Sequence, residues 1–253
     1  MMIELPDIPK RPQKPREKGL TMVMDKGISI AEAKMLMDSS QKFIDIVKFG
    51  FGTALITENI KEKIKLYKKH GIKVYLGGTL FEAFIARNMF SEYCEFIKKL
   101  EIDTVEISDG SIKMNHSQKC EYINQLANQK MTVFSEVGYK ISKKILAPSQ
   151  WIKLMEKEIE AGSWKVIAEA RESGNVGLYR SGGEVRSDLI EEILTKIPKD
   201  NILWEAPKKQ QQVFFIKLLG ANVNLGNIGT SDVIPLECLR LGLRGDTFFN
   251  FIQ

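Results

Sequence analysis

The stretch Lys165-Val-Ile-Ala-Glu-Ala-Arg-Glu-Ser-Gly174 begins as an apolar strand and ends in charged residues. Side chains alternate across a strand, so Glu169 and Arg171 are predicted to lie on the same face. A buried strand that ends in a carboxylate and a guanidinium fits either a structural ion pair at the rim of a sheet or a functional site. The same pattern recurs along the chain, and this recurrence favours a site.

Short apolar strands alternate with helical segments through the whole sequence. Strands are predicted at 20–24, 43–47, 73–76, 103–107, 131–135, from 165, at 201–204 and at 222–225. Helices are predicted at 29–39, 57–70, 80–100 with a break near Asn88, 117–128, 148–161, 184–197, 207–219 and 231–241. Such alternation predicts parallel strands joined by crossover helices. Eight units match a closed (β/α)8 TIM barrel, with a doubly wound open sheet as the alternative. The first predicted strand is not followed by G-x-G-x-x-G, which argues against a dinucleotide site.

The first 19 residues differ from the rest of the chain. Pro6, Pro9, Pro12 and Pro15 recur at every third position, a spacing that favours an extended arm over a helix. The arm is either a surface strap or a means of bringing Arg16 or Lys18 to an anion near the first strand. We therefore expect an arm at 1–19 packed on a single barrel domain at 20–253.

Composition restricts the possible functions. The chain of 253 residues is 43% hydrophobic and 27% charged, which is typical of a globular domain. No apolar run approaches the roughly 20 residues of a membrane helix, and the N-terminus lacks a signal-peptide pattern, so we expect a cytoplasmic protein without a membrane partner. The net charge of +5 is mild and no nucleic-acid-binding motif is present, so we expect small anionic substrates and no nucleic acid.

Metal binding, if present, should use oxygen ligands. The three cysteines have no metal-type spacing, and the two histidines lie far apart in the sequence. Carboxylate oxygens favour Mg²⁺ or a similar hard cation.

Active sites of barrels form where the strands end. The polar residues at the predicted strand ends are Asp25, Lys26, Lys48, Glu106, Asp109, Glu136, Glu169, Arg171, Glu205 and Asn227. Glu136, Glu169 and Glu205 end neighbouring strands, and converging carboxylates repel unless a cation neutralises them. The pattern predicts a divalent metal, with Asp25 as a further candidate ligand. The alternative is that the carboxylates pair with Lys26, Lys48, Lys140 or Arg171.

Two glycine-bearing loops are candidates for binding an anion. One contains Ser173 and Gly174, and the other contains Gly226, Asn227 and Gly229 and leads into a helix. Backbone N–H groups at such a place can bind phosphate, although a plain helix cap explains the pattern equally well. We expect Lys26, Lys48 and Arg171 to hold anionic groups of the substrate.

Several motifs together resemble a known family. They are K-P-R-E-K-G-L-T-M-V-M-D-K-G (14–27), V-K-F-G-F-G-T (47–53), Y-L-G-G-T-L-F-E (75–82), V-E-I-S-D-G (105–110), S-E-V-G (135–138), A-E-A-R-E-S-G (168–174), W-E-A-P-K-K-Q-Q-Q (204–212) and N-L-G-N-I (224–228). The set resembles the phosphosulfolactate synthase family and covers nearly the whole chain. The resemblance implies a Mg²⁺-dependent (β/α)8 barrel of the carbon–sulfur lyase class. Such an enzyme adds sulfite to phosphoenolpyruvate and forms (2R)-phospho-3-sulfolactate for coenzyme M biosynthesis or sulfolactate formation. The resemblance also suggests a homo-oligomer such as a trimer.

One motif departs from the family pattern. Where the family often has S-E-V-G-K-K, this chain has Ser135-Glu-Val-Gly-Tyr139-Lys140. A lysine here is the family's proposed acid, so the resemblance implies Lys140 as proton donor, unless Tyr139 has replaced the essential lysine. The expected catalytic set is Lys140, Lys48, Glu106 and Arg171. The alternatives are another barrel lyase or aldolase acting on a phosphorylated acid, and a non-enzymatic protein like the family's plant heat-stress-associated relative.

Overall fold

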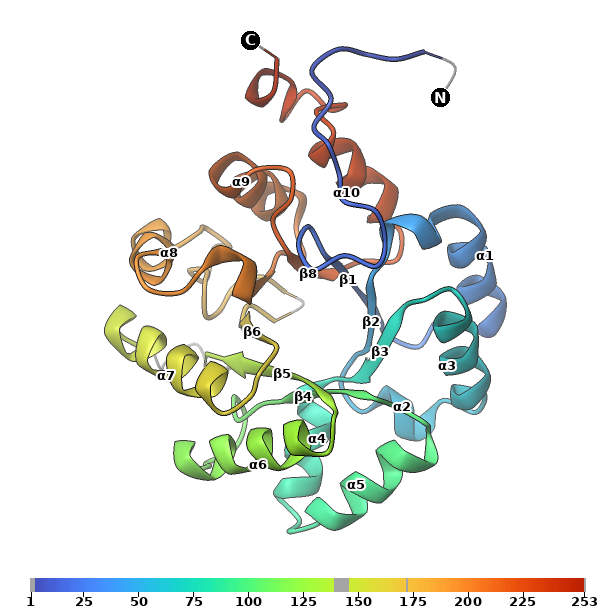
Figure 1. The fold of residues 1–253 in the computed structure, drawn as a ribbon, viewed down its shortest axis with the longest axis vertical. Coiled ribbons are helices and arrows are strands. Elements are labelled where there is room, and N and C mark those ends of the chain that lie inside the picture. The colour runs from blue at the N-terminus through green and yellow to red at the C-terminus, as the bar shows by residue number, and fades with distance from the viewer. Residues whose placement is uncertain (1–2, 139–145, 172, 253) are drawn as a thin grey trace.

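The computed structural model describes residues 3–138, 146–171 and 173–252, in which strands alternate with helices (Figure 1). The strands are β1 (Thr21–Asp25), β2 (Ile46–Phe49), β3 (Lys73–Leu76), β4 (Thr104–Ile107), β5 (Thr132–Val137), β6 (Lys165–Ala168), β7 (Ile202–Glu205) and β8 (Leu225–Ile228). The α-helices are α1 (Ile30–Ser40), α2 (Thr53–Ile56), α3 (Ile60–Lys69), α4 (Gly78–Ile85), α5 (Phe90–Lys99), α6 (His116–Asn128), α7 (Pro148–Glu160), α8 (Ser187–Leu194), α9 (Lys209–Leu219) and α10 (Val233–Arg240).

The strands form one parallel sheet that curls into a barrel. Their order is β3-β2-β1-β8-β7-β6-β5-β4, so the first and last strands of the sequence are hydrogen-bonded neighbours. The two end strands of this order, β3 and β4, also contact each other. Figure 1 shows the helices arranged as a ring around these strands. The predicted TIM barrel is therefore confirmed, and the open doubly wound sheet is excluded.

Most elements lie close to their predicted positions, but β2 begins at Ile46, three residues later than predicted. The expected break near Asn88 is confirmed, because Asn88 adopts a φ of 56° between α4 and α5. The helix predicted over 57–70 corresponds to α3 alone, and the short helix α2 before it was not predicted. The last strand begins three residues later than predicted, because the Asn224 amide bonds to Leu20 N and Ile202 O instead of continuing a regular strand.

Alternation along the strands separates two layers inside the barrel. An apolar layer fills the interior with Leu20, Met22, Ile46, Tyr75, Phe134, Ile167 and Leu203. A charged residue follows two positions later on four chain segments, as Lys48, Glu136, Glu169 and Glu205. Because side chains two apart share a face, the charged layer lies directly above the apolar one, at the carboxyl ends of the strands. The remaining apolar core packs between strands and helices.

The segment before β1 contains neither helix nor strand over residues 3–19. Its Arg11 Nε lies 2.9 Å from Glu237 Oε1 of α10, and Arg11 Nη1 lies 2.5 Å from Asn222 Oδ1. Figure 1 shows this segment passing along α10. These contacts hold the arm against the β8–α10 unit. Within the described ranges, we find no helix that is both long and apolar enough to cross a membrane.

Candidate active site

A small cavity of about 240 Å³ opens at the carboxyl ends of the strands. Its wall contains Met24, Lys48, Phe51, Thr79, Ser111, Glu136, Glu169, Arg171, Glu205 and Asn227. Six of these residues were among the sequence candidates: Lys48, Glu136, Glu169, Arg171, Glu205 and Asn227. The barrel therefore brings together groups that are up to 179 positions apart, from Lys48 to Asn227.

Lys48 lies at the centre of the charged layer. Its Nζ is 2.9 Å from Glu106 Oε2, 3.4 Å from Glu205 Oε1 and 3.8 Å from Glu136 Oε2. Burial works to lower the pKa of Lys48, but these three carboxylates outweigh burial and raise the pKa well above its ordinary value. Lys48 is therefore held as a fixed cation beside the cavity.

Glu106 supports Lys48 from behind. Its side chain is fully buried, does not line the cavity, and accepts a hydrogen bond of 2.5 Å from Gly78 N through Oε1. A side chain that is enclosed in this way anchors the lysine. Glu106 thus contacts Lys48 and Gly78 N and does not line the cavity, and its catalytic role stays a prediction.

Glu136, Glu169 and Glu205 form a carboxylate cluster. Each is at most 2% exposed, and one oxygen from each lies within 4.8 Å of the others. Burial raises the pKa of Glu205 from 4.5 to about 7; Lys48 opposes this shift, while Glu136 and Glu106 add to it. Three adjacent carboxylates in one buried place are a fitting donor set for a hard divalent cation such as Mg²⁺.

The two other polar residues at the cavity adopt uncommon backbone conformations. Arg171 and Asn227 both have a φ of 56°, in the left-handed region that non-glycine residues seldom occupy. Strain of this kind is often retained where it directs a functional side chain. Asn227 is 5% exposed, and its Oδ1 has no hydrogen-bond partner within the described part of the chain. A ligand in the cavity could supply that partner.

Glu169 and Arg171 do not share a strand face as predicted, because both lie beyond the end of the strand. Strand β6 ends at Ala168, and Arg171 N turns back to donate to Glu169 Oε1 at 2.6 Å. As a result Glu169 is buried inside the barrel mouth while Arg171 is exposed at the rim. Both nevertheless line the same cavity.

Asp25 is not brought to the carboxylate cluster. Met22 and Met24 of β1 face the barrel interior, so Asp25 points outward by the same alternation. Its Oδ2 lies 2.7 Å from Lys63 Nζ and 2.9 Å from Tyr67 Oη on α3. The expectation that Asp25 joins the metal ligands therefore needs correction. Asp25 instead fixes α3 to the end of β1.

Arg16 lies at the opposite end of the barrel. Its Nε pairs with Asp45 Oδ1 at 2.8 Å, and Asp45 Oδ2 accepts from Thr21 N at the start of β1. The amino ends of the strands meet here, so Arg16 cannot reach an anion at the mouth. Lys26 follows β1 as an exposed residue outside the cavity wall. Lys140 and Tyr139 lie outside the described residues.

The two predicted anion loops are less open than expected. Gly226 and Asn227 belong to β8, and the Asp232 carboxylate lies close to Gly229, where it would repel an anion. Ser173 Oγ donates to Asn175 Oδ1 at 2.6 Å. Gly174 is enclosed by Gln211 of α9, whose Nε2 donates to Gly174 O at 2.9 Å. Neither Ser173 nor Gly174 lines the cavity.

Sequence reasoning missed two polar residues beside the cluster. Ser108 Oγ lies 2.7 Å from Glu136 Oε1 and 2.5 Å from Glu82 Oε1. Glu82 is 2% exposed and lies on α4, so it does not belong to any strand end. The available signal was a single glutamate within the otherwise apolar run Leu80-Phe-Glu-Ala-Phe-Ile85.

Known proteins resemble this chain in fold and in sequence. 3-Hexulose-6-phosphate synthase from Salmonella typhimurium superposes with a TM-score of 0.55 and 14% identity over 87% of this chain and 99% of that one, which shows the barrel fold alone. Protein HEAT-STRESS-ASSOCIATED 32 of Arabidopsis thaliana is 24% identical over 91% of this chain and 88% of its own length.

Closer similarity is found to phosphosulfolactate synthases. The phosphosulfolactate synthase of Methanothermobacter thermautotrophicus is 40% identical over 94% of this chain and 95% of its own length. The sequence model of the (2R)-phospho-3-sulfolactate synthase (ComA) family matches residues 9–246. The matched range therefore spans every strand of the barrel, and the chain belongs to the (2R)-phospho-3-sulfolactate synthase family of enzymes.

Proposed function

We propose that this protein adds sulfite to phosphoenolpyruvate, with Mg²⁺ held by Glu136, Glu169 and Glu205. The observation that carries the proposal is the buried cluster of three carboxylates beside a fixed lysine, inside a family whose name specifies the product. The cavity of about 240 Å³ suits a ligand smaller than the drug-sized molecules that occupy roughly 300–1,000 Å³.

The reaction forms a carbon–sulfur bond. The sulfur of sulfite attacks the CH₂ carbon of phosphoenolpyruvate, and the double-bond electrons move onto the carboxylate as an aci-carboxylate. A proton then adds to C2. A bound divalent cation supplies stabilisation of the negative charge that develops on the carboxylate.

The chain's own residues have separate tasks in this scheme. Lys48 presents a fixed positive charge to an anionic substrate and offsets repulsion between two anions that must approach each other. Arg171 offers a guanidinium at the rim, suited to an oxyanion, and Asn227 offers an amide inside the cavity. Protonation from one face of C2 would fix the R configuration, and Lys140 remains our proposed donor.

A phosphorus NMR assay tests the proposal. The protein is incubated with phosphoenolpyruvate, sulfite and Mg²⁺, and a parallel sample receives EDTA. A new phosphomonoester resonance that requires both sulfite and free Mg²⁺ supports the synthase. If phosphoenolpyruvate stays unchanged at high enzyme concentration, sulfite addition is wrong, and a panel of phosphorylated acids would then test the lyase or aldolase alternative.

A further inference from the structure

A buried lysine behind strand β5 has no place in the scheme above. Lys119 of α6 is 1% exposed, and its Nζ contacts three groups from different elements. Nζ lies 2.8 Å from Glu158 Oε1 on α7, 2.9 Å from Asp109 Oδ1 after β4, and 2.5 Å from the Glu136 carbonyl oxygen on β5. Lys119 does not line the active-site cavity.

The surroundings keep this lysine charged. Burial works to lower the pKa of Lys119, but Glu158 and Asp109 outweigh it and hold the pKa above its ordinary value. Glu158 is itself fully buried, so neither partner can be removed without leaving a charge in a poorly solvated place. The position of the Lys119 ammonium is therefore fixed by its ion pairs with Glu158 and Asp109.

Lys119 supplies a donor where the β-ladder ends. The last paired residues of β4 and β5 are Ile107 and Ser135, so Glu136 lies one residue beyond the paired part of β4. The Lys119 ammonium donates to the Glu136 carbonyl at this position. It thereby fixes the main chain of Glu136, whose side chain faces the barrel mouth.

The same ammonium also fixes the loop that holds the Glu136 side chain. Asp109 directly follows Ser108, and Ser108 Oγ lies 2.7 Å from Glu136 Oε1. One buried cation therefore restrains both the backbone of Glu136 and the hydroxyl that orients its carboxylate.

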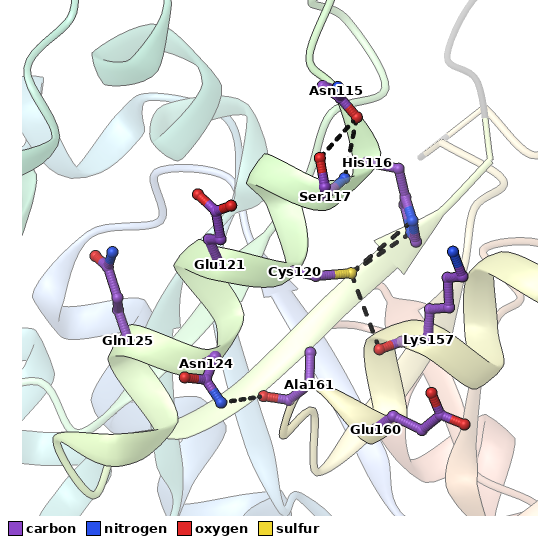
Figure 2. Close-up of a pocket in the computed structure, with 10 residues that line it drawn as sticks. All are labelled: Asn115, His116, Ser117, Cys120, Glu121, Asn124, Gln125, Lys157, Glu160 and Ala161. Carbon is purple, nitrogen blue, oxygen red and sulfur yellow. Dashed lines mark hydrogen bonds between the residues drawn. The ribbon is translucent and has the colours of Figure 1, made fainter.

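The network extends outward to the groove between α6 and α7. Glu158 Oε1 also lies 3.1 Å from His116 Nε2. Figure 2 shows His116 in this groove, next to Cys120 and opposite Lys157. Lys119 thus lies between the outer helices and the carboxylate cluster.

We propose that Lys119 is a positioning residue that sets the place of Glu136 for binding the divalent cation. The inference rests on the proposed metal role of Glu136. Residues that orient metal ligands commonly change metal affinity by about 10- to 100-fold when they are removed. Lys119 acts through Glu136 and touches neither substrate nor cation.

The test compares Lys119→Met with a matched control, Lys63→Met. Lys63 is also 1% exposed, and its Nζ also pairs with a carboxylate and a carbonyl, at 2.7 Å from Asp25 Oδ2 and 2.7 Å from Ile28 O. Both variants lose a buried cation, so both should melt at lower temperature. Mn²⁺ serves as the probe, and electron paramagnetic resonance measures the free ion during titration of each folded protein.

We expect the Kd for Mn²⁺ to rise at least about tenfold in Lys119→Met and to stay at the wild-type value in Lys63→Met. If Lys119→Met does not fold, the double variant Lys119→Met/Glu158→Gln removes the cation together with one of its buried carboxylates and should show the same rise. A folded variant lacking Lys119 that binds Mn²⁺ as tightly as wild type overturns the inference. Wild type that binds no Mn²⁺ overturns the proposed metal site instead.

Discussion

At the scale of single residues, Lys48 carries a buried positive charge that lies within 4.0 Å of three carboxylates, those of Glu106, Glu136 and Glu205. We expect Lys48→Met to lower turnover by about 10²–10³-fold, the usual cost of removing one fixed group that stabilises developing charge. The measurement is the rate of product formation, with thermal melting to show that the variant is folded. Lys34→Met, on the exposed face of α1, is the control and should retain full activity. A folded Lys48→Met enzyme with wild-type turnover would contradict the role of Lys48.

Glu205 should make the metal-free protein less stable at higher pH. Its pKa is raised from 4.5 to about 7 in the folded state, so the folded state binds this proton more tightly than the unfolded chain. The resulting contribution to the free energy of unfolding is fully present below about pH 4.5 and is lost as pH rises through about 7. A shift of this size corresponds to at most about 3 kcal/mol.

The Glu205→Gln variant isolates this contribution, because a glutamine cannot ionise. In EDTA, the variant should melt close to wild type at pH 5 and above it at pH 8. Differential scanning calorimetry of both proteins at the two pH values provides the comparison. A stability difference that does not depend on pH would show that Glu205 has an ordinary pKa.

At the scale of elements, the N-terminal arm is expected to stabilise the fold without contacting substrate. Arg16 pairs with buried Asp45 at the amino ends of the strands. Arg16→Met leaves that carboxylate unpaired and should lower the free energy of unfolding by about 3 kcal/mol. The KM for phosphoenolpyruvate should not change. An increase in KM with unchanged stability would instead place Arg16 at the substrate.

Most helices and strands, and six of the residues that line the cavity, could be predicted from the sequence. The alternation of strands and helices predicted the barrel, and the helix predicted from residue 29 corresponds to α1, where Ser29 and Glu32 form both hydrogen bonds of a capping box. The residues Glu136, Glu169 and Glu205 could be predicted because each comes at the end of a predicted apolar strand. Asp25 lies elsewhere because it follows the inward-facing Met24 by one position, which turns its side chain to the outer face of β1.

Other features of the site could not have been found in this way. Glu82 comes from a helix, and Lys119 reaches Glu136 from behind the sheet, so neither has a strand-end signature. The turn that separates Glu169 from Arg171 depends on where β6 stops, which is the least certain part of a sequence-based assignment. Contacts between distant segments decide these positions.

At the scale of the whole molecule, the barrel concentrates carboxylates that a bound cation should stabilise. A ligand present at 100 times its Kd adds about 2.7 kcal/mol to folded-state stability. Mg²⁺ in excess should therefore raise the melting temperature by several degrees, and EDTA should reverse the change. Glu169→Gln is the control and should respond weakly. An equal rise in wild type and Glu169→Gln would mean that the ion binds elsewhere.

The most direct measurement of the central claim is anomalous diffraction from crystals soaked in Mn²⁺. We predict a strong anomalous peak bounded by the carboxylates of Glu136, Glu169 and Glu205, within reach of a substrate in the cavity beside Lys48. Absence of a peak there in crystals that contain Mn²⁺ at saturating concentration would contradict the account. The carboxylate cluster would then be a network of ion pairs and not a metal site.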